Sequence, residues 1–96
     1  MKGEASTNEA AALIARTARH FAHKVPVATS DGYAAVETRF GRAELTAVRD
    51  GISIVLAPAH GEPVDRLREV IDSHLTRLAR TPLEIQWSEG KERDSA

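Results

Sequence analysis

The chain has 96 residues, of which 42% are hydrophobic and 28% are charged, as expected for a single globular domain with one core. Its formal net charge of -1 excludes a global positive field that would attract nucleic acid or an anionic membrane. The chain has no cysteine, which excludes disulfides and thiolate chemistry, and its longest early apolar run, residues 10–15, is far below the roughly 20 residues of a membrane span. We therefore expect a cytoplasmic protein that neither inserts into a membrane nor binds nucleic acid.

The first predicted element is an amphipathic helix that begins near Thr7 and ends near His23. Thr7 offers an N-cap hydroxyl, and apolar residues then recur at intervals of three and four, the period of one helix face. Pro26 cannot continue the helix, so the chain should leave it before that residue. We expect residues 1–6, ahead of the helix, to form a flexible N-terminal tail. The apolar stripe consists of Ala10, Leu13, Ile14, Thr17, Ala18 and Phe21.

From residue 25 the apolar residues recur with a period of two, which predicts strands. Residues 25–29 contain Pro26 and suit an edge strand, because proline cannot donate to a central ladder. Asp50 and Gly51 form the strongest hairpin dipeptide of the chain. Three such connections predict an antiparallel meander of four strands, over residues 25–29, 33–40, 43–48 and 52–56.

A second amphipathic helix follows, with Pro63 suited to its first turn and Pro82 beyond its end. Residues 83–87 alternate again and predict a final strand, whereas residues 88–96 are polar and aperiodic, which predicts a disordered C-terminal tail. Residues 7–87 should thus form one α+β domain, a two-layer sandwich in the order helix, four strands, helix, strand. Its mostly antiparallel sheet should carry both helices on its apolar face and leave the polar face open to solvent or a partner chain.

The segment HFAHK at residues 20–24 holds two of the four histidines. On a helix, His20 leans toward the apolar stripe and His23 toward solvent, and positions three apart can face one ion. Catalytic zinc and iron sites usually take three protein ligands, and His74, inside the stripe of the second helix, is the third candidate. The sequence therefore permits a divalent metal such as Zn or Fe on His20, His23 and His74.

Each of these residues also has a structural interpretation that needs no ligand. Basic side chains at a helix C-terminus are favoured by the helix dipole, which accounts for His20, His23 and Lys24. A half-buried His74 can be satisfied by a backbone carbonyl or by the neighbouring hydroxyl of Ser73. Lys24 would act as a Schiff-base nucleophile only if buried, which the local sequence does not ensure. The sequence leaves these alternatives open.

Several motifs together resemble a known family. In order and spacing, Thr7, HFAHK at 20–24, RAEL at 42–45, SHLTRLA at 73–79 and Trp87 are similar to the bacterial domain of unknown function 2218 family. Members often carry a cysteine where this chain has Ala18, so a cysteine-dependent role does not transfer. The resemblance implies a fold similar to TATA-binding-protein-like or phosphomutase C-terminal sandwiches. It also implies a ligand-binding set of His20, His23, Lys24, Ser73 and His74.

The resemblance associates the chain with siderophore uptake and iron acquisition, and some family members carry an aldolase label that resembles a transferred name. We therefore expect a small binding or accessory protein in iron or siderophore handling, with a histidine-containing cleft for an iron–siderophore complex or another small molecule. One alternative is an enzyme that uses His20, His23 and His74 for metal or acid–base chemistry. The other alternative is an interaction module that forms a homodimer through the open sheet face.

Overall fold

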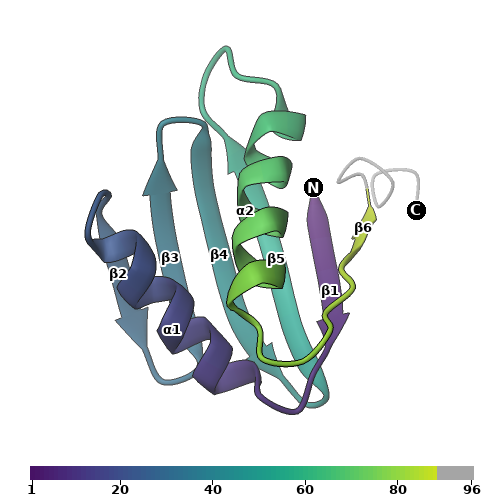
Figure 1. Cartoon of the computed structure of the whole chain (residues 1–96). Helices are drawn as coiled ribbons and strands as arrows, with labels where there is room; N and C mark the ends of the chain where they lie inside the picture. Colours follow the sequence, from purple (N-terminus) through teal and green to yellow (C-terminus); the bar gives the residue numbers. More distant parts are fainter. Residues whose placement is uncertain (89–96) are drawn as a thin grey trace.

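The computed structural model describes residues 1–88 (Figure 1). The strands are β1 (Lys2–Ser6), β2 (Val27–Ser30), β3 (Tyr33–Thr38), β4 (Gly41–Val48), β5 (Gly51–Pro58) and β6 (Gln86–Ser88), and the helices are α1 (Ala10–Ala22) and α2 (Val64–Leu78). The α+β class and the predicted succession of helix, four strands, helix and strand are confirmed, with one further strand ahead of α1. Ser88 ends β6, and the remainder of the predicted C-terminal tail, residues 89–96, lies outside the described residues.

The described strands form one sheet in the order β2-β3-β4-β5-β1-β6, and every pairing in it is antiparallel. β2 to β5 are the predicted meander. Gly32, in the turn between β2 and β3, has a φ of 66°, which glycine adopts without steric cost. Gly51 follows the β4–β5 turn and is needed for a different reason, because a Cβ there would collide with the carbonyl oxygen of Ala5 in β1.

Residues 2–6 form β1, so the flexible N-terminal tail that the sequence led us to expect is wrong. β1 lies between β5 and β6 and pairs with both. Only Gly3 and Ala5 face the helices, and such small side chains give the sequence no visible alternation. The segment is therefore held as a strand by its pairing with β5 and β6, and not by the strand preference of its own residues. A Cβ at Gly3 would lie 2.7 Å from the ring of Trp87, so glycine leaves the space that this ring fills.

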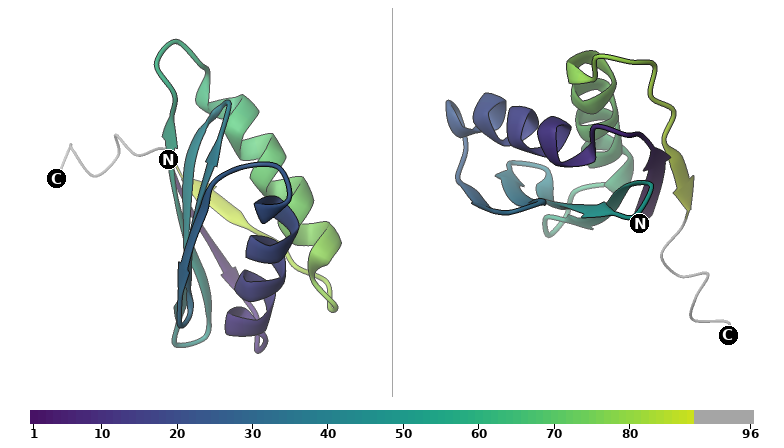
Figure 2. Two further views of the ribbon diagram at one scale, coloured as in Figure 1. Left: turned by 90° about the vertical axis from the view of Figure 1, so that its left-hand side faces the viewer. Right: turned by 90° about the horizontal axis from the view of Figure 1, so that it is seen from below.

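Both helices cover one face of the sheet and leave the other face open, as Figure 2 shows from two further directions. α1 contacts β2, β3 and β4, and α2 contacts β4 and β5. The predicted two-layer sandwich with both helices on one face is therefore confirmed. No helix in residues 1–88 is long and apolar enough to cross a membrane. The largest fully buried apolar side chains are Leu13, Ile14, Leu45, Ile52, Ile54, Leu67, Ile71, Leu75 and Val36.

Polar contacts join the beginning of α1 to the end of α2. Thr7 accepts a hydrogen bond from the backbone N–H of Glu9 at 3.1 Å, so the predicted capping hydroxyl acts just before the helix. The Glu9 carboxylate accepts hydrogen bonds from the Arg80 backbone N–H at 2.9 Å and the Arg16 guanidinium at 3.1 Å. Arg16 also donates to the carbonyl of Leu78. These hydrogen bonds hold the pKa of Glu9 below its ordinary value, and the bond from the Arg80 backbone has the largest effect, followed by that from Arg16.

Candidate functional site

The structure brings two of the predicted histidines together where α1 crosses α2. The ring centroids of His20 and His74 are 5.1 Å apart, and the ring of Phe21 lies 4.7 Å from that of His74. Both imidazoles are half-buried. His23 is the C-cap residue of α1 and is exposed, as is Lys24. The helix-end interpretation thus describes the positions of His23 and Lys24, while His20 and His74 form a pair.

His74 is anchored by its own helix. Its Nδ1 lies 2.7 Å from the carbonyl oxygen of Val70, and since a carbonyl only accepts, Nδ1 donates the proton. Ser73 is exposed, and its hydroxyl donates to the same carbonyl at 3.2 Å, so the carbonyl rather than Ser73 satisfies His74. Among residues 1–88, no three His, Cys, Asp or Glu side chains are placed to hold one metal ion. The arrangement therefore pairs two of the predicted ligands and leaves His23 out.

The environment of His20 favours its neutral form. Burial is the largest cause that holds the pKa of His20 below its ordinary value of 6.5. Positive charge on His74, Arg77, Lys24 and His23 acts in the same direction. A neutral imidazole keeps one nitrogen free to accept a hydrogen bond or to bind a metal ion, but two histidines alone make a weak metal site.

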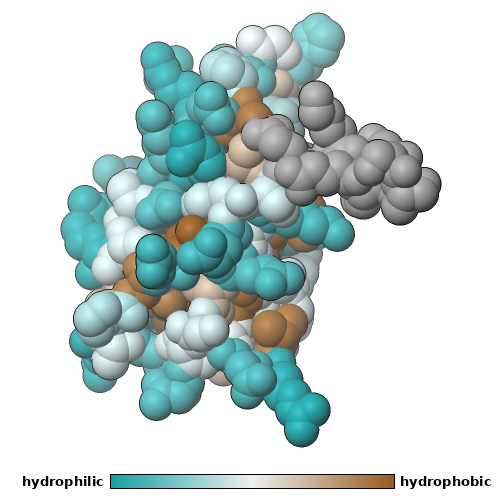
Figure 3. Space-filling view, turned by 90° about the vertical axis from the view of Figure 1, so that its right-hand side faces the viewer, coloured by the Kyte–Doolittle hydropathy of each residue, from teal (hydrophilic) through white to brown (hydrophobic). Residues whose placement is uncertain are grey.

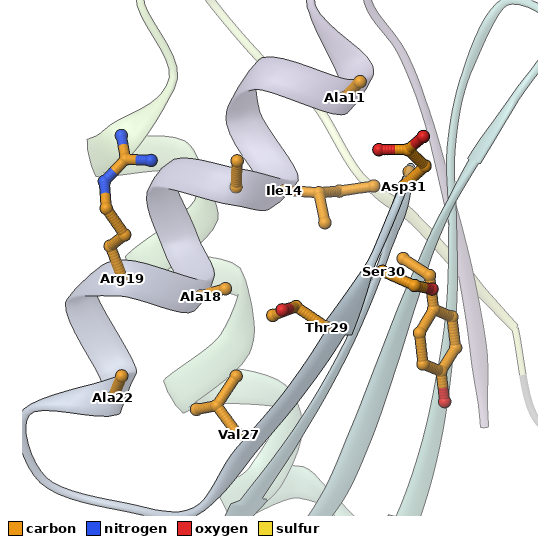
Figure 4. Close-up of a pocket in the computed structure, with 12 residues that line it drawn as sticks. Ala11, Ile14, Ala18, Arg19, Ala22, Val27, Thr29, Ser30 and Asp31 are labelled. Atoms are coloured by element: carbon orange, nitrogen blue, oxygen red, sulfur yellow. The ribbon is translucent and has the colours of Figure 1, made fainter.

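A groove lies on another flank of α1, between this helix and the edge strand β2 (Figure 4). Its volume is about 600 Å³, which is within the usual range of small-molecule pockets. Polar residues at its border are Arg19, Thr29, Ser30, Asp31 and Tyr33, and in Figure 4 the Arg19 side chain extends along the flank of α1 away from β2. The apolar part is lined mainly by small side chains: Ala11, Ile14, Ala15, Ala18, Ala22 and Val27. The groove therefore has apolar walls and a few polar groups.

None of the predicted site residues lines this groove. At about 100° per residue, His20 lies roughly opposite the alanines on the wheel of α1, so the helix presents the histidine to α2 and the alanines to the groove. The sequence did contain one indication of the groove: Ala11, Ala15, Ala18 and Ala22 recur at helical spacing and define a second face of the first helix. Alanine is also the commonest helix former, so that spacing becomes informative only once β2 is known to be an uncovered edge.

A second hollow, of about 720 Å³, is bordered by β1 and the β4–β5 turn. Carboxylates from Glu4, Asp50 and Glu84 line it beside Arg49, so its charge is mainly negative. Figure 3 shows the β6 side of the molecule, where hydrophobic residues are scattered among hydrophilic ones. The groove beside α1 is thus the more apolar of the two hollows.

Comparisons with known proteins agree with this fold. A family model described as an uncharacterized protein conserved in bacteria (DUF2218) matches residues 2–88. The NMR structure of PA4090 from Pseudomonas aeruginosa is similar, with a TM-score of 0.68 and 26% sequence identity over 91% of this chain and 94% of that chain. Among curated proteins, none matches the sequence.

Proposed function

The chain belongs to the DUF2218 family of uncharacterized bacterial proteins, and we propose that it is a small binding protein whose ligand occupies the groove between α1 and β2. The observation that carries this proposal is the groove itself, an apolar hollow of about 600 Å³ with polar groups at its border. Small-molecule sites commonly combine apolar walls with a few polar groups that orient the ligand. This binding function needs no catalytic residue.

The side chains of the groove define the class of ligand. Ala15 and Ala18 project no further than a methyl group, so an aromatic ring can approach the helix closely. Thr29 and Ser30 supply hydroxyls that can donate to a carboxylate or phenolate, and Arg19 adds positive charge at the rim, from the flank of α1 that is turned away from β2 in Figure 4. We therefore propose an aromatic acid or an aromatic chelator as the ligand. An iron–siderophore complex with catecholate arms has this chemistry. Our working hypothesis is therefore that the protein takes part in iron handling in the cytoplasm.

Calorimetric titration tests this proposal with three ligands: a ferric tricatecholate siderophore, its iron-free form and a simple aromatic carboxylate. Ala15→Phe fills the groove, and we expect it to weaken binding by about tenfold or more. Ala12→Phe is the matched control, because Ala12 is exposed on the same helix and does not line the groove. If only the carboxylate binds, the groove remains the binding site and the siderophore is rejected as its ligand. Equal binding by both variants would refute the groove as the site.

The pair of His20 and His74 favours a second candidate function, which is metal or acid–base chemistry. Its support is the 5.1 Å separation of the two rings together with their partial burial. A metal ion here would need further donors from a bound molecule, since two protein ligands hold zinc or iron weakly. Titration with Zn(II) and Fe(II) tests it: His74→Ala should abolish binding, whereas His60→Ala, in an exposed loop, should not. Equal affinity in both variants would exclude the pair.

A further inference from the structure

The surface where α1 crosses α2 gathers positive charge from both helices around His20. Burial is the largest cause that lowers the pKa of His20, and the positive charges of four nearby groups lower it further. These groups are His74 and Arg77 of α2, and His23 and Lys24 at the end of α1. We call the five residues the basic seam. The half-buried rings of His20 and His74, 5.1 Å apart, form its centre, and the exposed side chains of Lys24 and Arg77 extend from it.

The charges of the basic seam have no acidic partner within residues 1–88. Neither Lys24 nor Arg77 takes part in the ion pairs found there. α1 contains no acidic residue. Side chains three or four positions apart are neighbours on a helix, and none of these neighbours of Arg77 is acidic: they are Ser73, His74, Arg80 and Thr81. The two helices therefore place no counter-charge beside these cations.

Helix dipoles explain each cation of the seam separately, but not their approach to one histidine. A dipole favours cations at a helix C-terminus, where Lys24 and Arg77 both lie. The two helices run in opposite directions, as Figure 1 shows, and Glu9 at the start of α1 bonds to the backbone of Arg80 just beyond α2. Their C-termini thus lie at opposite ends of the crossing, yet the charges of both cations act on His20. A bound anion would offset the repulsion between these like charges.

We propose that the basic seam binds a phosphate group of a soluble small molecule, held by Lys24 and Arg77 beside His20. The planar guanidinium of Arg77 can donate two parallel hydrogen bonds to phosphate oxygens, and Lys24 supplies a compact second charge. A phosphate group with two negative charges balances both cations, whereas a carboxylate balances only one. A ring N–H of exposed His23 can add a further donor.

The proposed phosphate site is separate from the groove, because His20 faces α2 and lies roughly opposite the alanines that line the groove. It therefore does not rest on the function proposed for the groove. Arg19 adds positive charge to the approach, since its side chain lies on the flank of α1 away from β2 in Figure 4 and Arg19 is one turn from His23.

An anion suits the basic seam better than a metal ion does. A metal ion on His20 and His74 would bring further positive charge close to Lys24 and Arg77, which repel it. The same charges attract a phosphate group. The metal and phosphate proposals for this crossing thus require ligands of opposite charge, and a titration without metal ions separates them.

Amide chemical-shift titration of the full chain with inorganic pyrophosphate, in buffer freed of metal ions by a chelating resin, tests the phosphate site. We expect shifts that concentrate in residues 20–24 and 74–77 and leave residues 27–33 of the groove unchanged. Lys24→Gln and Arg77→Gln should each raise the dissociation constant by about tenfold, since each removes one charge-assisted contact. Arg49→Gln is the matched control, because Arg49 is exposed in the β4–β5 turn, away from the seam. It should leave the dissociation constant unchanged.

Two further ligands identify the charge and the source of the phosphate group. Acetate, with a single charge, should bind at least about tenfold more weakly than pyrophosphate. Vesicles of phosphatidylcholine with and without phosphatidic acid test a lipid headgroup as the source, and binding to the acidic vesicles without binding of pyrophosphate would overturn a soluble ligand. No saturation by about 10 mM pyrophosphate would overturn the site itself. Equal affinity of Lys24→Gln, Arg77→Gln and Arg49→Gln, each folded by its amide spectrum, would also overturn it.

Discussion

Glu9 links the two helices through Arg16 and the backbone of Arg80, and this link is pH-dependent. Because the pKa of Glu9 is lowered on folding, its contribution is present above the ordinary value of 4.5 and is lost as the pH falls through the lower folded value. We expect Glu9→Gln to lower the melting temperature at neutral pH and to reduce the loss of stability in acid. The control is Glu62→Gln, in an exposed loop. Identical melting curves for wild type and Glu9→Gln would contradict this role.

His20 makes the stability of the fold depend on pH in a higher pH range than Glu9 does. Its folded pKa lies below 6.5, so the unfolded chain binds more protons between these two values, and stability falls as the pH drops below about 6.5. Urea denaturation at pH 7.5 and at about pH 5 should show a smaller pH effect for His20→Gln than for wild type. His60→Gln, in an exposed loop, should behave as wild type. If the stability of His20→Gln falls with pH as much as that of wild type, other groups cause the effect and this prediction is wrong.

Gly51 has a steric role at the junction of β5 with β1. A Cβ there would meet the backbone of Ala5 and Ser6, which cannot move without breaking the strand pairing. We expect Gly51→Ala to cost about 1–3 kcal/mol of unfolding free energy, the usual range for overpacking. Urea denaturation measures it, with Asp50→Ala in the adjacent turn as control. A change below about 0.5 kcal/mol would show that β1 shifts freely.

At the scale of elements, Trp87 fastens β6 to α2. Its indole N–H donates to the Asp72 carboxylate at 2.8 Å, and its ring packs over Gly3. Since the side chain is half-buried, Trp87→Ala should cost about 2 kcal/mol, below the range for fully buried tryptophan. Trp87→Phe keeps most of the ring and loses the hydrogen bond, about 1 kcal/mol. Equal losses in the two variants, measured by urea denaturation followed by circular dichroism, would contradict this division between packing and hydrogen bonding.

The elements that could be predicted from the sequence are those with a strong apolar period. Both helices and the meander from β2 to β5 carry that period, and the structure has them close to the expected bounds. β1 could not be predicted, because Gly3 and Ala5 fill its inward positions and its stability comes from β5 and β6. The final strand was expected over residues 83–87, but pairing with β1 begins only at Gln86.

The candidate site was only partly predictable for a related reason. The register of each helix indicated that His20 and His74 face inward, but their separation depends on how α1 crosses α2, which no local pattern determines. His23 was placed correctly at the helix end, because Pro26 cannot continue the helix. The groove escaped prediction because β2 has no second neighbouring strand among residues 1–88, which is a property of the sheet order and not of any local pattern.

At the scale of the whole molecule, two helices cover one face of the sheet, and no third helix in residues 1–88 lies beside β2. The small side chains of α1 leave room for a groove on that side, and β2, which within the described part of the chain pairs only with β3, borders it. Ligand binding is therefore proposed for this region of the molecule. The ion pairs of Arg42 keep the open face polar.

The most direct test of the groove is amide chemical-shift mapping with the diamagnetic gallium(III) form of a tricatecholate siderophore and with an aromatic carboxylate. The account predicts that shifts concentrate in the groove-lining positions Ala11, Ala15, Ala18 and Ala22 and in residues 27–33, and that Ala15→Phe abolishes them while Ala12→Phe does not. Shifts centred on His20 and His74 at the α1–α2 crossing, or no shifts at these groove-lining positions with either ligand, would contradict it.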